Sequence, residues 1–137
     1  MHGPKVGRWP RALNLGFPNT FDKAHGRTGS YLLVHGGCSS VGCYAMTNAV
    51  MAEIFALSEE ALRVGQDRIQ VHVFPFRMSE TNLASHTDSP WIDFWRNLKE
   101  GYDAFEATRV PPRVGLCDKR YAVEAAAPEE VGGQGPL

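Results

Sequence analysis

Residues 30–43 read SYLLVHGGCSSVGC, and this stretch holds the densest set of structural and chemical signals in the chain. Its apolar run, Tyr31-Leu32-Leu33-Val34, predicts a short buried strand. His35 ends that run, and a glycine-rich loop then returns the chain to Cys43. A thiol nucleophile needs a base, and the N–H groups of a tight turn can stabilise an oxyanion. The stretch therefore predicts a strand and loop that carry the groups of cysteine-dependent acyl transfer.

On either side of this stretch, apolar spacing predicts further strands. The patch Ala12-Leu13-Asn14-Leu15 lies between loop residues, and residues 69–76 alternate apolar and polar before Pro75. Residues 114–117 and 120–123 predict a last strand or strand pair. Together these runs predict a mixed or antiparallel β-sheet.

Two helices are expected from apolar residues at three- and four-residue steps, over about 47–64 and 89–107. Thr47 fits the N-cap of the first helix and Gly65 its C′ position. Ser89 and Pro90 fit the N-cap and N1 positions of the second. The chain is therefore expected to be an α+β protein with two main helices.

Length and composition narrow the function classes. A chain of 137 residues has room for one domain with a modest core, and its net charge of -1 gives no bulk electrostatic case for nucleic acid or an anionic membrane. No apolar run approaches the ~20 residues of a membrane span, and the first residues do not resemble a signal peptide, which alone favours a cytoplasmic protein. We expect an irregular segment over 1–11 and a disordered tail over 124–137.

Cys43 is the stronger nucleophile candidate and Cys38 the weaker. An isolated cysteine is most often a small buried hydrophobe. Here Gly42 allows a sharp turn just before the thiol, and the N–H groups of Gly42, Cys43 and Tyr44 could converge on an oxyanion. The helix that starts a few residues later adds the positive end of its dipole. His35, at the end of the strand, becomes a credible general base, while Ser40 can hydrogen-bond the turn.

Zinc binding is the rival chemistry. His35, Cys38 and Cys43 could supply three ligands, with His72 or Cys117 as the fourth. The C-x4-C spacing lies at the edge of what structural zinc sites use, and no second CxxC pair exists. The residues alone leave this alternative open.

The segment from His35 to Thr47, HGGCSSVGCYAMT, resembles the L,D-transpeptidase catalytic (YkuD-type) family, and most closely its YafK-like branch. The resemblance extends upstream through residues 12–19 and 25–29. Downstream it includes residues 71–78 and, more loosely, Arg120-Tyr121. It therefore implies a catalytic domain over about 12–123.

The resemblance implies acyl transfer on peptidoglycan stem peptides, with no metal and no organic cofactor. Cys43 would attack the amide carbonyl of the third-position diamino acid, with His35 as general base and later acid. D-Alanine would leave, and a thioester would remain until an amine resolves it, either on another stem or on an envelope protein. Resolution by water would instead make the protein a carboxypeptidase, and the reverse reaction an amidase. The resemblance also implies a place in the cell envelope, in a periplasm for a Gram-negative source.

Further substrate contacts are expected from Ser40, Gly36 and Arg77, the last through a substrate carboxylate, although a solvated arginine is an equal alternative. His72, on an alternating segment, fits a packed or rim histidine. Val41 stands where the wider family has a histidine, as the YafK-like branch tolerates. A block resembling G-D-x-x-T-P-E-G, which follows Gly-Pro-Lys in relatives, is missing after residues 3–5. We therefore expect an N-terminally truncated domain with an exposed sheet edge, and an inactive cell-wall binding module is a further alternative.

Overall fold

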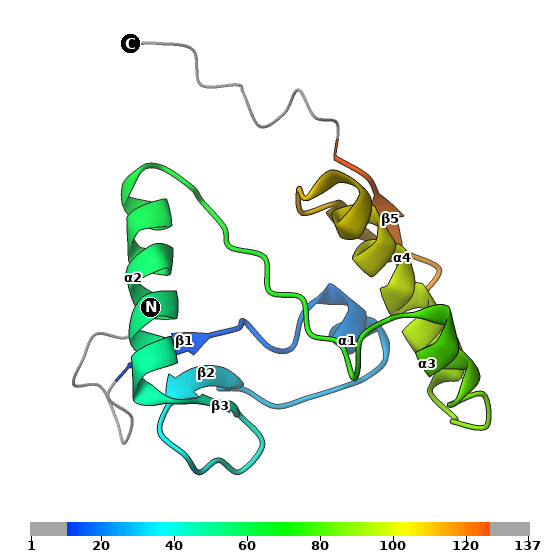
Figure 1. The fold of residues 1–137 in the computed structure, drawn as a ribbon, viewed down its shortest axis with the longest axis horizontal. Helices are drawn as coiled ribbons and strands as arrows, with labels where there is room; N and C mark the ends of the chain where they lie inside the picture. The colour runs from blue at the N-terminus through cyan, green and yellow to red at the C-terminus, as the bar shows by residue number, and fades with distance from the viewer. Residues whose placement is uncertain (1–10, 127–137) are drawn as a thin grey trace. The chain divides into compact units, whose positions relative to one another are not determined.

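The computed structural model describes residues 11–126, which form two compact units divided between Val71 and His72. Figure 1 shows both units along the coloured ribbon. The first unit contains the stretch that decides the fold, and the second contains a helical pair and a hairpin.

The first unit is built on a three-stranded mixed sheet. Its strands are β1 (Ala12–Asn14), β2 (Leu33–Gly36) and β3 (Tyr44–Met46), in the order β1-β2-β3. β1 runs antiparallel to β2, whereas β3 runs parallel to it. The prediction of a mixed sheet is thus confirmed, but β3 is an element that the sequence patterns did not indicate.

Helix α2 (Asn48–Arg63) covers this sheet and completes its core. The Thr47 side chain accepts a hydrogen bond from the N–H of Val50 at 3.3 Å, as expected of an N-cap. Met51 and Phe55, one turn apart, are buried together with Val34 of β2. The predicted helix is confirmed to within a residue at either end.

A short helix, α1 (Thr20–Ala24), lies in the connection between β1 and β2. Asn19 and Asp22 form a capping box in which the Asn19 side chain accepts from the Asp22 N–H at 2.9 Å. Asp22 also binds Arg27 through an ion pair of 2.9 Å. The sequence predicts a loop here, because the segment is too short to show the apolar stripe of a helix.

The second unit joins two helices to a hairpin. Its elements are α3 (Glu80–Ala84), α4 (Ile92–Thr108), β4 (Arg113–Cys117) and β5 (Arg120–Glu124), with β4 and β5 antiparallel. Asn97 of α4 is buried and makes two hydrogen bonds to the backbone of Tyr121 in β5, of 2.9 Å from its Nδ2 and 2.8 Å to its Oδ1. The expected strand pair is therefore confirmed, and one amide side chain fixes it to α4.

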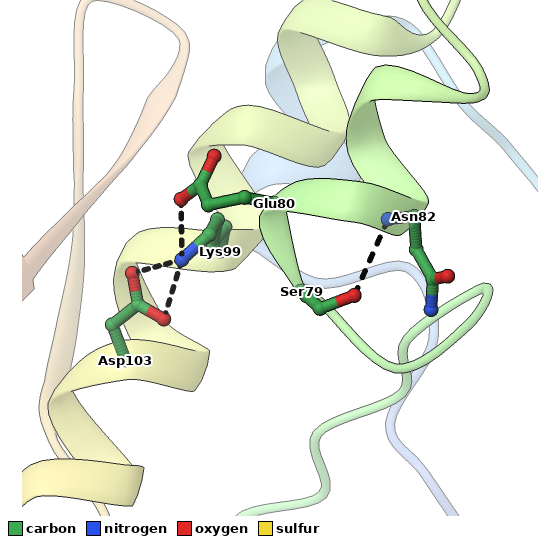
Figure 2. Close-up of polar contacts among 5 residues, drawn as sticks. All are labelled: Ser79, Glu80, Asn82, Lys99 and Asp103. Carbon is green, nitrogen blue, oxygen red and sulfur yellow. Dashed lines mark hydrogen bonds and ion pairs between the residues drawn. The ribbon is translucent and has the colours of Figure 1, made fainter.

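The ion pair of Lys99 with Glu80 ties α4 to α3, and further polar contacts stabilise each helix, as Figure 2 shows. The Ser79 hydroxyl caps α3 by accepting from the Asn82 N–H at 3.2 Å. Lys99 of α4 lies 3.2 Å from a Glu80 oxygen and 2.7 Å from Asp103 Oδ1. Its hydrogen bond to Asp103, assisted by Glu80, raises the pKa of Lys99 above its usual value.

Three predictions about elements are wrong. The strand expected over residues 31–34 runs instead over Leu33–Gly36, because Tyr31 has a φ of +61° and lies exposed outside the ladder. Residues 69–76 do not form a strand, and Ile69, Val71 and Val73 are exposed. Alternation gives such a segment one apolar face, but a strand also requires a neighbour in register, which the pattern cannot supply. The second long helix begins at Ile92 rather than near Ser89, because the Ile92 N–H bonds to the Ser89 carbonyl in a tighter turn.

The predicted irregular segment over 1–11 lies outside the described residues except for Arg11. The predicted disordered tail begins too early, since β5 extends to Glu124, and its residues from 127 on lie outside the described range. Within residues 11–126, no helix is long and apolar enough to cross a membrane.

Candidate active site

The parallel strands β2 and β3 are joined by the short loop 37–43, which carries Cys38, Ser40 and Cys43. Parallel neighbours are usually joined by a crossover of a dozen or more residues, so this connection is tight. Gly42 has a φ of +98°, in the left-handed region that favours glycine, and a Cβ there would meet no atom within 4 Å. The glycine is therefore required for backbone conformation and not for space.

Cys43 lies at the end of this loop, directly before β3, and is half-buried. Its Sγ donates to the Tyr31 carbonyl oxygen at 3.6 Å. Its own carbonyl accepts from the Ser40 hydroxyl at 2.7 Å. The Tyr44 N–H belongs to the same planar peptide as that carbonyl, so it points away from Ser40.

His35 lies in the central strand β2 and has no exposed surface. Its Nδ1 is 2.9 Å from the Gly36 carbonyl oxygen. A carbonyl only accepts, so this contact assigns the proton to Nδ1 and leaves Nε2 as the acceptor nitrogen of the neutral ring. The backbone thereby selects the tautomer that a general base requires.

The strand register relates the imidazole to the thiol. His35 pairs with Ala45, so their side chains lie on the same face of the sheet. Cys43 lies directly before β3, where the chain bends, so the register itself places only Ala45 beside His35. His35 and Cys43 lie near the two ends of the loop that joins these paired strands.

Gly36 brings α2 close to the site. A Cβ on Gly36 would lie 2.8 Å from Asn48 Oδ1 and 3.5 Å from Met51 Cβ, so any larger residue would require the Asn48 side chain to shift in the first turn of α2. The buried Gly36 also supplies the carbonyl that orients His35. Sequence reasoning assigned it a substrate contact, which stays a prediction, and missed both of these structural roles.

Three residues considered with this site belong to the second unit. Arg77 is exposed, and its carbonyl accepts from the Ser79 N–H and the Asn82 side chain, both at 2.8 Å. His72 meets the Phe74 ring edge-on, with centroids 6.3 Å apart. Cys117 is exposed in β4. Their predicted contacts with substrate or metal stay predictions.

The zinc alternative requires at least three ligating side chains in one place. Among residues 11–126, no group of three or more His, Cys, Asp or Glu side chains is arranged to hold a metal ion. Cys38 is exposed and Cys43 half-buried, and both are free thiols. The ligand set considered from the sequence is therefore not assembled in the part of the chain that the structure describes.

The contact of Cys43 with Tyr31 is a further feature of the site that the sequence does not indicate. Tyr31 has a φ of +61°, which a tyrosine rarely adopts. Glycine or asparagine would have signalled this conformation, whereas a tyrosine in an apolar run indicates a strand. No sequence pattern pointed to it.

No family model matches the chain. It is 49% identical over 124 residues to the "Putative L,D-transpeptidase YafK" of Escherichia coli K12 and equally to that of Escherichia coli O157:H7. The match covers 90% of this chain, and the chain spans about half the length of these curated relatives. The resemblance drawn from the central motif is thus confirmed: over the matched residues the chain is a homologue of the two proteins that carry this name.

Proposed function

We propose that the protein is a cysteine-dependent L,D-transpeptidase that acts on peptidoglycan stem peptides in the cell envelope, with Cys43 as nucleophile. One observation supports the proposal: the buried, carbonyl-oriented His35 of β2 and the half-buried Cys43 before β3 lie near the two ends of one short loop between paired strands. The homologues' name supplies the reaction class. The substrate and the location follow from that class.

In the first half-reaction, His35 Nε2 takes the proton from Cys43 Sγ, and the thiolate attacks the carbonyl carbon of the third-position residue. A carbon–sulfur bond forms and the carbon–nitrogen bond to the terminal D-alanine breaks. His35 returns the proton to the departing amine. The Gly36 carbonyl holds the imidazole in the required tautomer and stabilises it while it carries the extra proton.

The oxyanion of the tetrahedral intermediate needs donors. We propose that the backbone N–H groups near the Gly42 turn supply them, including those of Cys43 and Tyr44. Ser40 fixes the peptide between Cys43 and Tyr44 through its 2.7 Å hydrogen bond, so it acts on the orientation of the Tyr44 N–H. Arg77 would bind a substrate carboxylate.

In the second half-reaction, an acceptor amine attacks the thioester, a carbon–nitrogen bond forms and the carbon–sulfur bond breaks. His35 takes the proton from the amine and returns it to the sulfur, which regenerates the thiol. An amine on another stem gives a cross-link, and an amine on an envelope protein attaches that protein. Water in place of the amine gives net removal of D-alanine. The nature of the acceptor distinguishes transfer from hydrolysis.

A tetrapeptide assay tests this function. The full chain is incubated with stem tetrapeptide, with and without a second amine-bearing stem, and released alanine and cross-linked product are measured by mass spectrometry. We expect alanine release that disappears in Cys43→Ala and falls about 10²- to 10⁴-fold in His35→Gln. Cys38→Ser is the matched thiol control and is expected to retain turnover. Alanine release that survives Cys43→Ala, or no release by folded protein, would contradict the proposal.

A further inference from the structure

The backbone of Tyr31 is held in an unusual conformation directly beside the thiol. Its φ of +61° lies in the left-handed region, where residues other than Gly, Asn and Asp are uncommon. Such conformations concentrate at functional sites, where the surrounding structure enforces them. The conformation of Tyr31 therefore calls for a reason in its contacts.

The side chain of Tyr31 does not provide that reason, because it is 67% exposed. The backbone on the C-terminal side does. The Leu32 carbonyl accepts from the Leu15 N–H at 3.0 Å, which fixes that peptide in the extension of the β1–β2 ladder. The preceding carbonyl, that of Tyr31, points to the opposite side of the chain and accepts from Cys43 Sγ at 3.6 Å, and the φ of Tyr31 sets how the chain before it leaves this fixed peptide.

We propose that Tyr31 is a positioning residue whose left-handed backbone holds the resting Cys43 thiol through its carbonyl oxygen, until deprotonation releases the sulfur for attack. An S–H group donates to a carbonyl only while it carries its proton. Transfer of that proton to His35 therefore ends the contact and leaves two electron-rich atoms facing each other. The sulfur is then free to rotate toward an acyl carbon.

This inference rests on Cys43 being the nucleophile, as proposed above, but its test requires no peptidoglycan substrate. The second-order rate of alkylation of Cys43 by iodoacetamide is measured at a fixed pH in the full chain. The background carries Cys38→Ser and Cys117→Ser, so that Cys43 is the only thiol. Tyr31 is then replaced by residues that tolerate the left-handed conformation to different degrees.

Tyr31→Gly and Tyr31→Asn remove the ring and keep a backbone that accepts a positive φ, so alkylation is expected within about twofold of the parent. Tyr31→Val and Tyr31→Ala disfavour that backbone. Their rates are expected to rise by about 5- to 30-fold, with valine the faster. Rescue by asparagine distinguishes the backbone from the tyrosine side chain.

Amide hydrogen exchange of residues 33–36 reports whether β2 remains formed in each variant. If the valine variant loses that protection, the alanine and glycine variants alone decide the outcome. Equal rates for these two would overturn the proposal, as would a uniform increase in all four, which indicates shielding by the ring. If the valine and alanine variants are alkylated faster as expected but the protein does not turn over the tetrapeptide, the positioning role of Tyr31 is supported. The proposed transpeptidase function is then contradicted.

Discussion

Gly42 lies directly before Cys43 and has a φ of +98°. No atom lies within 4 Å of the position that a Cβ of residue 42 would take. An alanine there meets no clash, but it must adopt a backbone conformation that costs about 1–2 kcal/mol. Gly65 is a matched position, with the same φ of +98° and equally open surroundings, at the end of α2. The two glycines separate a local effect on the thiol from a general effect on stability.

We predict that Gly42→Ala slows acylation of Cys43 about tenfold, because the loop relaxes and moves the thiol. Both substitutions should lower the midpoint of thermal unfolding by a similar amount. Gly65→Ala, however, should leave the rate of acylation unchanged. Both are measured by the rate of covalent adduct formation with a carbapenem and by thermal melting. Equal effects of the two variants on acylation would contradict a specific role for the Gly42 turn.

Residue chemistry was the most predictable part of the site. Cys43, His35 and Gly42 were singled out from their types and spacing, and the structure places them around the β2–β3 loop. Backbone partners were not predictable. The Gly36 carbonyl contacts His35 at the end of β2, and the Tyr31 carbonyl contacts Cys43 beside a backbone with positive φ. Every residue has a carbonyl, so the sequence cannot indicate which one contacts a given side chain.

Among the elements, the hairpin β4–β5 is held to α4 by a buried amide side chain, beside an ion pair of Glu100 with Arg120. Asn97 is 3% exposed and forms both of its hydrogen bonds with the backbone of Tyr121. A buried donor or acceptor that loses its partner costs about 1–3 kcal/mol. Asn97 therefore links the helix to the hairpin through polar contacts that apolar residues cannot replace.

We predict that Asn97→Leu speeds hydrogen exchange of the Tyr121 amide by one to two orders of magnitude, since about 1–3 kcal/mol of protection is lost. Asn97→Asp keeps an acceptor for that amide and should retain most of the protection. Exchange is followed by NMR or by mass spectrometry of peptides from β5. Equal exchange rates in Asn97→Leu and the parent protein would show that the contact does not hold the hairpin.

Lys99 pairs with Asp103 within α4 and with Glu80 of α3, and the contribution of these pairs to stability depends on pH. Asp103, with help from Glu80, raises the pKa of Lys99 in the folded state. The stabilisation is therefore complete below the pKa of lysine in the unfolded chain, about 10.4. It is lost as the pH rises through the higher pKa that Lys99 has in the folded state. Glu80 is largely exposed, so the effect is expected to be at most about 1 kcal/mol.

We predict that Lys99→Met destabilises the second unit by up to about 1 kcal/mol at pH 8. The difference from the parent should shrink above about pH 11, where Lys99 of the parent also loses its charge. Urea unfolding of both proteins at the two pH values measures this change. A difference that stays constant across the range would mean that packing of the lysine stem, and not its charge, is responsible.

Elements with a long apolar stripe were predictable from sequence, and those defined by pairing were not. Helix α2 follows from the spacing of Met51 and Phe55 and from its cap at Thr47. Strand β3 has no distinguishing sequence pattern, because it is only a few residues long and is defined by its hydrogen-bonded pairing with β2. Residues 69–76 carry the strand pattern but form no strand.

On the scale of the whole molecule, the sequence suggested one catalytic domain over 12–123, whereas the described residues form two compact units. The division falls within residues 69–76, where alternation had predicted a strand continuous with the rest of the sheet. Composition does not change at that point, so nothing in the residue types marked the division. The boundaries of the catalytic domain stay a prediction, and the first unit holds both proposed catalytic side chains.

The central claim is that Cys43, and no other thiol of this chain, is an acylatable nucleophile. Intact mass spectrometry after exposure to a carbapenem tests it most directly, because opening of the lactam ring adds the whole compound and expels no group. The parent and Cys38→Ser proteins are predicted to gain one adduct, whereas Cys43→Ala gains none. The claim would be contradicted if folded parent protein formed no adduct, or if the adduct persisted in Cys43→Ala.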